Sequence, residues 1–199
     1  MKTAWRTIDP LGRFLSKWLA AAFVLALITF ILLPFNDLKF TVPLYHLETV
    51  LWFALSLISG VALYYSSFPE KAPAWPKYCF VSFFSILVGL TFNHASITPH
   101  LLQEAALEMD LWRGRCGFLI GLLSMGFTTY LFRWSRQGAP RSPRVAGLWA
   151  AFSAASLGCF LMQPVCLHDS SMHLLIWHFL PVMGISLIGA ETARFILKW

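Results

Sequence analysis

Six long stretches without a charged residue alternate with shorter polar segments along the 199-residue chain. Most of these stretches are long enough to cross the ~30 Å hydrocarbon core of a bilayer as a helix. Lipid offers no partner to a backbone amide, so such segments must satisfy their own hydrogen bonds as helices. The pattern therefore predicts an all-α fold, a bundle of six transmembrane helices that forms a single domain over residues 1–199. The stretches are residues 18–36, 49–69, 78–103, 116–132 (the shortest), 145–168 and 170–190.

The basic residues gather on one side of this predicted bundle. Most of the 15 Lys and Arg residues precede the first stretch, lie in the connections 66–77 and 133–144, or follow the last stretch. Because basic residues favour the cytoplasmic side of a membrane, both termini are predicted to be cytoplasmic, an N-in/C-in topology. This placement explains the net charge of +6 without nucleic acid. A charged content of only 12% excludes an ordinary soluble domain.

Two shorter segments carry helical signals of their own. Residues 1–17 form a short basic cytoplasmic tail with apolar residues at helical spacing and Pro10 in a first turn; it suits either anionic lipid or a cytoplasmic partner. In the connection after the third stretch, Thr98 and Pro99 predict a helix start. The following residues place His100 and Glu104 on one face. A short interfacial helix is therefore predicted there, between the third and fourth transmembrane helices.

Two of the four cysteines are predicted to lie close together. Cys116 opens the fourth stretch and Cys166 follows most of the fifth, with a basic turn at 133–144 between them. A chain that crosses the membrane and returns brings both thiols to the same face, which would be the periplasm of a bacterium, where disulfides persist. Cys116 with Cys166 is the favoured pair. Cys159 with Cys166 is the second choice, because Cys159 lies about a turn deeper in the predicted helix. The sequence alone does not fix the connectivity.

These thiols could be reactive or passive. Arg113 and Arg115 beside Cys116 would stabilise a thiolate, and His168 would do the same for Cys166. The alternative is a passive pair or a static disulfide. Cys79 begins the third stretch at the opposite face and is interpreted as a small buried hydrophobe.

Metal binding is a competing interpretation of the same segment. Cys166, His168, Asp169 and His173 supply thiolate, imidazole and carboxylate donors within a short span, a mixture that suits zinc or another transition metal. Their spacing matches no tight ligand pattern. His178 is expected to bond a neighbouring helix rather than to bind a metal.

Other features concern packing and catalysis. Gly117-x-x-x-Gly121 predicts a close helix contact, and Pro181 predicts a kink in the last helix. The sequence has no nucleophile–base–acid set, phosphate-binding loop or His-Glu-x-x-His motif. No enzyme activity is therefore predicted.

The second half of the chain resembles the NrsF-like anti-sigma factors, bacterial inner-membrane proteins of six helices. The resemblance is clearest over residues 110–199. It rests on Trp112-x-x-x-Cys116, Gly138-Ala139-Pro140-x-x-Pro143-x-x-Ala146-Gly147 and Cys166-x-x-Asp169-x-x-x-His173-x-x-x-Trp177-His178.

The resemblance implies a partner, an extracytoplasmic-function sigma factor held at the cytoplasmic face and released under oxidant or metal stress. It also implies that Cys116 and Cys166 are the sensing pair. Family members carry a longer segment before the first helix, which directs sigma binding here to the connections 66–77 and 133–144 as well. Membrane lipid is a further partner, and direct nucleic-acid contact is not expected. The basic candidates for the sigma contact are Arg6, Arg13, Arg133, Arg136, Arg141 and Arg144.

The sequence thus favours a membrane-bound negative regulator without a cofactor, apart from a transition-metal ion that Cys116 and Cys166 could capture. One alternative is a membrane thiol–disulfide oxidoreductase, which would be expected to carry Cys-x-x-Cys, and the chain has none. Another is a metal or small-solute carrier, which would need polar residues at mid-bilayer depth.

Overall fold

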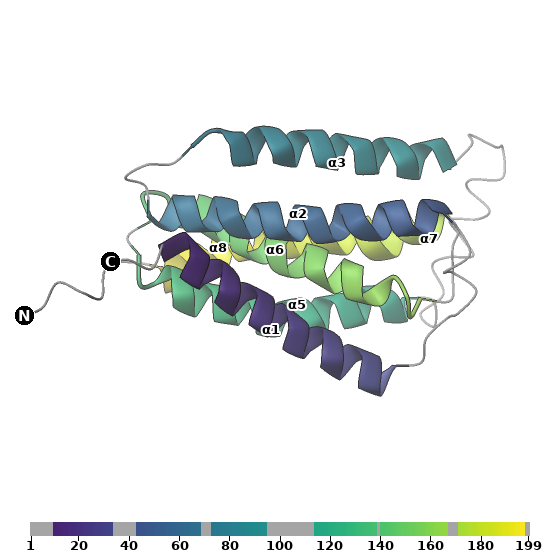
Figure 1. Ribbon diagram of the computed structural model, residues 1–199, viewed down its shortest axis with the longest axis horizontal. Coiled ribbons are helices and arrows are strands. Elements are labelled where there is room, and N and C mark those ends of the chain that lie inside the picture. The colour runs from purple at the N-terminus through teal and green to yellow at the C-terminus, as the bar shows by residue number, and fades with distance from the viewer. Residues whose placement is uncertain are drawn as a thin grey trace, which may run out of the picture.

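A computed structural model describes residues 10–33, 43–68, 73–94, 114–138, 140–166 and 171–197. Within these ranges the regular structure is entirely helical, which confirms the all-α class. In Figure 1 successive long helices run in opposite directions, so the start of α1 and the end of α8 lie at the same end of the bundle. The elements are α1 (Pro10–Leu32), α2 (Pro43–Ser67), α3 (Trp75–His94), α5 (Arg115–Ser135), α6 (Pro143–Met162), α7 (Ser171–His173), the π-helix η3 (Leu174–Phe179) and α8 (Leu180–Ile196).

Proline begins several of these helices. Pro10, Pro43 and Pro143 are the first residues of α1, α2 and α6, and Pro76 is the second residue of α3. Proline presets a helical φ and has no N–H to leave unsatisfied in the first turn. The predicted first turn at Pro10 is thereby confirmed, and α1 includes part of the basic tail.

Five helices are long and apolar enough to cross a membrane. The sixth, α3, has a shorter apolar part, Trp75–Leu90, so five of the six predicted spans have the length and apolar composition of a membrane helix among the described residues. The predicted interfacial helix near Thr98 lies outside the described residues. The five candidate spans are Leu11–Leu32, Tyr45–Ser67, Arg115–Ser135, Pro143–Met162 and Leu174–Ile196.

The outside of the bundle is strongly apolar. Phe23, Ile31, Phe118 and Phe195 are each about 70% exposed, at 68%, 73%, 72% and 70%. A water-soluble protein rarely displays so many large apolar side chains, whereas a lipid-facing surface requires them.

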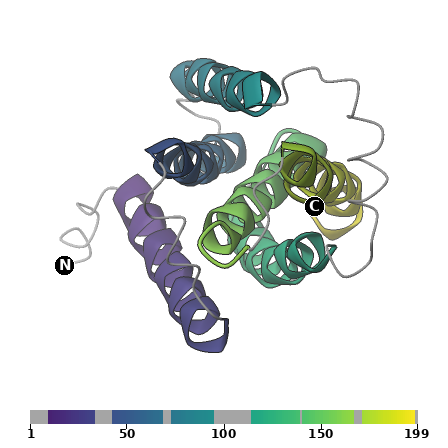
Figure 2. The same cartoon turned by 90° about the vertical axis from the view of Figure 1, so that its right-hand side faces the viewer.

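Helix α6 is the centre of the bundle. It packs most extensively against α8, then against α2 and α5. Figure 2, which looks along the bundle, shows α1 and α3 at its periphery. Because α6 is covered on several sides, small residues occupy much of its length, from Ala146 to Gly158, and most of them are fully buried.

The closest helix contact joins α6 to α8. A methyl group added at Gly147 would collide with Ala193, and one added at Gly189 would collide with Ala151. These four residues form two small-x-x-x-small pairs that face each other, the pattern that allows close approach of membrane helices. The predicted contact at Gly117-x-x-x-Gly121 is wrong in part, because Gly121 has nothing within 4 Å of an added methyl.

A buried polar contact joins α1, α2 and α6. Ser56 donates its hydroxyl hydrogen to the backbone carbonyl of Ser153 at 2.5 Å, and Ser153 donates to the carbonyl of Ser56 at 2.8 Å. Trp18 of α1 donates its indole N–H to the Ser153 hydroxyl at 3.2 Å. Such bonds between membrane helices are each worth roughly 1 kcal/mol. They satisfy these hydroxyl groups inside the bundle.

Candidate functional site

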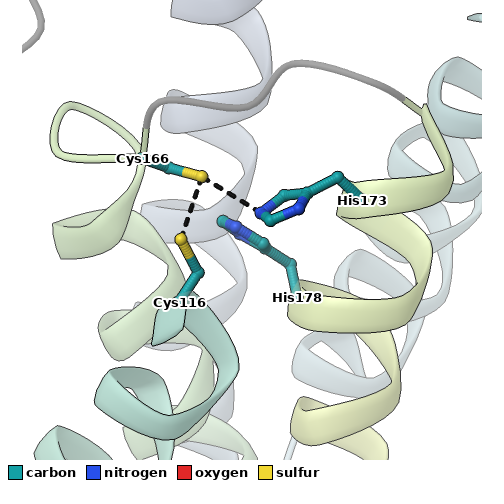
Figure 3. Close-up of side chains that lie close together, drawn as sticks. All are labelled: Cys116, Cys166, His173 and His178. Carbon is teal, nitrogen blue, oxygen red and sulfur yellow. Dashed lines mark hydrogen bonds between the residues drawn. The ribbon is translucent and has the colours of Figure 1, made fainter. Parts of the chain in front are cut away.

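Cys116 and Cys166 meet at the end of the bundle opposite the start of α1, here called the cysteine end. Cys116 lies in the first turn of α5. Cys166 follows α6 in a turn in which the backbone N–H groups of Val165 and Cys166 both bond the carbonyl of Met162. The two sulfur atoms are 3.0 Å apart and are not joined by a disulfide (Figure 3). The proximity predicted from the hairpin is confirmed.

Two histidines complete this cluster. Nε2 of His173 is hydrogen-bonded to the sulfur of Cys166 at 3.2 Å. The ring of His178 lies beside that of His173, with centroids 5.6 Å apart. One donor atom from each of the four side chains lies within 4.8 Å of the other three. All four residues are buried, with the histidines 0% exposed and the cysteines 1–8% exposed.

The π-helix η3 explains why both histidines reach the cluster. In an α-helix, residues five apart point about 140° away from each other, because each residue turns about 100°. In a π-helix the repeat is i to i+5, so His173 and His178 come to the same face. The N–H of Leu180 bonds the carbonyl of Leu175, five residues back. Pro181 favours this local change because it offers no N–H to the carbonyl of Trp177.

Trp177 of η3 packs against the start of α5. A methyl group added at Gly114 would lie 2.7 Å from its indole ring, and one added at Gly117 would lie 3.0 Å from it. Only glycine at these two positions leaves room for the ring so close to Cys116. Gly117 therefore packs against Trp177, and it does not form a helix contact together with Gly121.

The hydrogen bonds of the cluster act on the Cys166 thiol. The bond donated by Cys116 lowers the pKa of Cys166 below the ordinary thiol value, and the bond to His173 lowers it further, although burial opposes both. Since the thiolate is both the nucleophile and the metal ligand, the arrangement favours reactivity at Cys166.

His178 was expected to bond a neighbouring helix; its ring lies beside the thiol of Cys166 and contributes to lowering the pKa of that thiol, without hydrogen-bonding geometry. Neither of its ring nitrogens has a hydrogen-bonding partner among the residues that the structure describes. A buried polar group without a partner costs about 1–3 kcal/mol. The cluster of four side chains is thus incomplete as a hydrogen-bonded set.

The other predicted site residues fall in different places. Cys159 lies deeper in α6, with its sulfur 3.8 Å from the carbonyl oxygen of His178, and is not among the four clustered donors. Cys79 lies on α3, half-buried and away from them. His168, Asp169 and Arg6 lie outside the described residues.

The family model described as "Negative regulator of sigma F" (NrsF) matches residues 5–199. The chain belongs to the NrsF family. The match covers nearly the whole chain and so extends the resemblance seen in the motifs of residues 110–199. The NrsF description is that of a regulator of a sigma factor and not of an enzyme. Comparisons with curated proteins and with solved structures found no match.

The NrsF-family chain carries its arginine candidates at the other end of the bundle, here called the basic end. Arg13, Arg133, Arg136 and Arg141 are exposed there. Arg144 instead forms an ion pair with Glu191 at 3.3 Å, and Glu191 is also paired with Arg194 at 2.9 Å. The predicted set of arginines therefore contains one whose charge is already partly neutralised.

Two open clefts lie between the helices at the basic end. The first, of about 320 Å³, is lined by two cations, Arg13 and Lys17, and by an aromatic group that includes Phe14 and Trp134, whose ring centroids are 4.2 Å apart. The second, of about 220 Å³, includes Arg141 and Trp149 in its lining. Cationic and aromatic walls of this kind suit an acidic peptide with apolar anchors.

Proposed function

We propose that this NrsF-family protein is a membrane-bound anti-sigma factor. It holds an extracytoplasmic-function sigma factor at the cytoplasmic face of the bacterial inner membrane and releases it when Cys116 and Cys166 react with an oxidant or a metal ion. Family membership supports the partner, and five apolar helices support the membrane location. The observation that carries the sensing step is the 3.0 Å distance between two buried thiols.

The oxidation step needs only these two thiols and a peroxide. The two sulfurs lose two protons and two electrons and form one S–S bond, while hydrogen peroxide takes them up and becomes two molecules of water. The sulfurs must approach by about 1 Å, since the S–S bond is ~2.05 Å long. The two sulfurs lie at the start and at the end of the α5–α6 hairpin, so the new bond pulls the start of α5 toward the turn after α6.

The route to the cytoplasmic face runs through α6 and α8. The close Gly147–Ala193 and Gly189–Ala151 contacts transmit a displacement of one helix to the other, because neither helix can approach further. Arg144 of α6 and Glu191 of α8 are paired beside this contact, at the basic end. A signal requires that oxidation stabilise one arrangement of these helices over another.

The basic end is where the sigma factor is proposed to dock. An acidic surface of the partner would meet the exposed arginines by charge complementarity, with apolar side chains entering the aromatic cleft beside Arg13. Binding of this kind weakens as salt rises.

The decisive experiment is affinity purification of the protein from gently solubilised membranes, with mass spectrometry of what is retained. A sigma factor should be retained and should be lost after peroxide treatment. Cys116→Ser and Cys166→Ser should each retain it after the same treatment. Cys159→Ser and Cys79→Ser are matched controls, because these thiols lie outside the cluster, and they should release it normally.

Two results would contradict the proposal. Normal release from Cys116→Ser would remove the thiol pair from sensing. Absence of any sigma factor, together with quinone reduction by the purified protein from a dithiol donor, would favour the oxidoreductase alternative.

A further inference from the structure

We infer that Cys116, Cys166, His173 and His178 form a four-coordinate site for a divalent, thiol-preferring metal ion of the Zn²⁺ and Cd²⁺ class. The inference deepens the proposed sensor, on which its regulatory meaning rests. The site itself depends only on the geometry of the cluster.

The donor set matches the chemistry of such an ion. Two thiolates and two imidazoles are a Cys₂His₂ set, which is common in structural zinc sites. Two thiolates neutralise the charge of a divalent ion, so the loaded site has no net charge. This matters because all four residues are buried, and an unbalanced charge there would be strongly unfavourable.

The distances allow the ion with small movements. Tetrahedral Zn²⁺, with Zn–S near ~2.3 Å and Zn–N near ~2.0–2.1 Å, requires donor atoms about 3.3–3.8 Å apart. The two sulfurs are now 3.0 Å apart, the Cys166 sulfur is 3.2 Å from Nε2 of His173, and every donor pair is within 4.8 Å. The donors therefore need to shift by about 1 Å or less.

The unsatisfied ring of His178 points to a ligand independently of the cysteines. Its two nitrogens are buried without a hydrogen-bonding partner among the described residues, although its ring is held beside the thiols. Figure 3 shows the four side chains converging from α5, from the turn after α6 and from α7 and η3. A coordinated metal would bond one nitrogen of His178. Because η3 brings His173 and His178 to the same face of the helix, both rings could bind the same ion.

A bound ion and a disulfide exclude each other, since the ion requires both sulfurs as thiolates and oxidation converts both into one S–S bond. The present separation of 3.0 Å lies between the ~2.05 Å of an S–S bond and the ~3.8 Å of two thiolates on one ion. Metal binding should therefore spread the start of α5 from the turn after α6, whereas oxidation should draw them together. Metal occupancy should also protect both thiols from peroxide.

The test uses the full-length reduced protein in detergent and Co²⁺ as the probe. A tetrahedral Co²⁺ site with thiolate ligands gives intense visible absorption and a sulfur-to-cobalt charge-transfer band. We expect one equivalent of Co²⁺ per chain to produce both, and Zn²⁺ and Cd²⁺ to displace it. His173→Ala and His178→Ala should each weaken binding by more than the ~10–100-fold typical of outer partners of a metal site.

Controls separate ligand loss from misfolding. Cys159→Ser, whose thiol contacts only the edge of the cluster, should bind Co²⁺ like the parent protein. His178→Cys should keep a four-ligand set and strengthen the charge-transfer band, which an unfolded variant could not do. Thermal unfolding of each variant without metal tests whether the helical bundle is still folded.

Unchanged Co²⁺ binding in His178→Ala would overturn the four-ligand site, as would absence of binding to the reduced parent protein. Retention of the sigma factor, measured in parallel, keeps the two proposals apart. A protein that retains and releases its sigma factor on oxidation but binds no Co²⁺ would refute the metal site alone.

Discussion

The two ends of the bundle differ in what they bury. The cysteine end encloses two thiols and two imidazole rings, each at most 8% exposed. The basic end displays exposed arginines around open aromatic clefts. Buried groups suit selective reaction with a small molecule or ion, while exposed charges suit recognition of a large acidic partner.

The two ends are separated by the length of the helices, yet the same helices form both. α5, α6 and the η3–α8 segment each contribute to the cysteine end, and α5, α6 and α8 each reach the basic end. The close α6–α8 contact lies between the two. Changes at either end or at this contact should therefore have separable effects.

The largest expected effect is chemical and confined to the cysteine end. Diamide, which accepts two electrons and two protons, should join Cys116 to Cys166 and leave Cys159 and Cys79 as free thiols. The reason is that only the first pair has its sulfur atoms 3.0 Å apart. Mass spectrometry of non-reduced peptides measures this, and a Cys159–Cys166 link would contradict the geometry.

The contact between the ends should be sensitive to a single methyl group. Gly189→Ala should destabilise the protein by about 1–3 kcal/mol, because the added methyl meets Ala151 in a closely packed crossing. Thermal unfolding in detergent measures the change. Gly184→Ala on the same helix is the matched control, because nothing lies within 4 Å of its added methyl. Equal effects of the two substitutions would show that the α6–α8 contact is looser than described.

Reversing one charge at each end should separate recognition from sensing. Arg13→Glu should weaken sigma binding about tenfold and reduce its salt dependence, since Arg13 lines the aromatic cleft. Arg115→Glu, an exposed position at the cysteine end, should leave binding unchanged. Binding assays over a range of salt concentrations test both. An equal loss in the two variants would mean that the partner is not confined to the basic end.

The smallest effect is expected at Glu191. Glu191→Gln removes the partner of Arg144 and Arg194, but all three side chains are about half exposed, so the stability of the protein should change very little. Sigma binding should strengthen slightly because the basic end gains positive charge. A marked fall in the temperature of thermal unfolding would show that the ion pairs hold α6 and α8 together.

Much of the fold was predictable because one physical constraint acts along the chain. Apolar segments of membrane length must be helices, so the positions of the long helices followed from charge-free stretches. The meeting of Cys116 and Cys166 followed from the fact that a hairpin returns to its starting side. The motifs around Cys116 and Cys166 sufficed to indicate the NrsF family, which the family match confirmed.

Other features depended on contacts between segments distant in sequence. Gly117-x-x-x-Gly121 and the Gly147–Ala151 pair have the same spacing, and only packing decides which of them faces another helix. The place of Cys159 was similarly undetermined, since the sequence does not say which of Cys159 and Cys166 faces Cys116, and the sulfur of Cys159 bonds a backbone carbonyl instead.

The long helices, the hairpin and the paired thiols were evident from the order of residues, because hydrophobic length and chain direction are local properties. The presence of His178 in the site depends on tertiary packing. Its five-residue separation from His173 would place the two on different faces of an α-helix. Pro181 and the seating of Trp177 on Gly114 and Gly117 accompany the π-helix that brings them together.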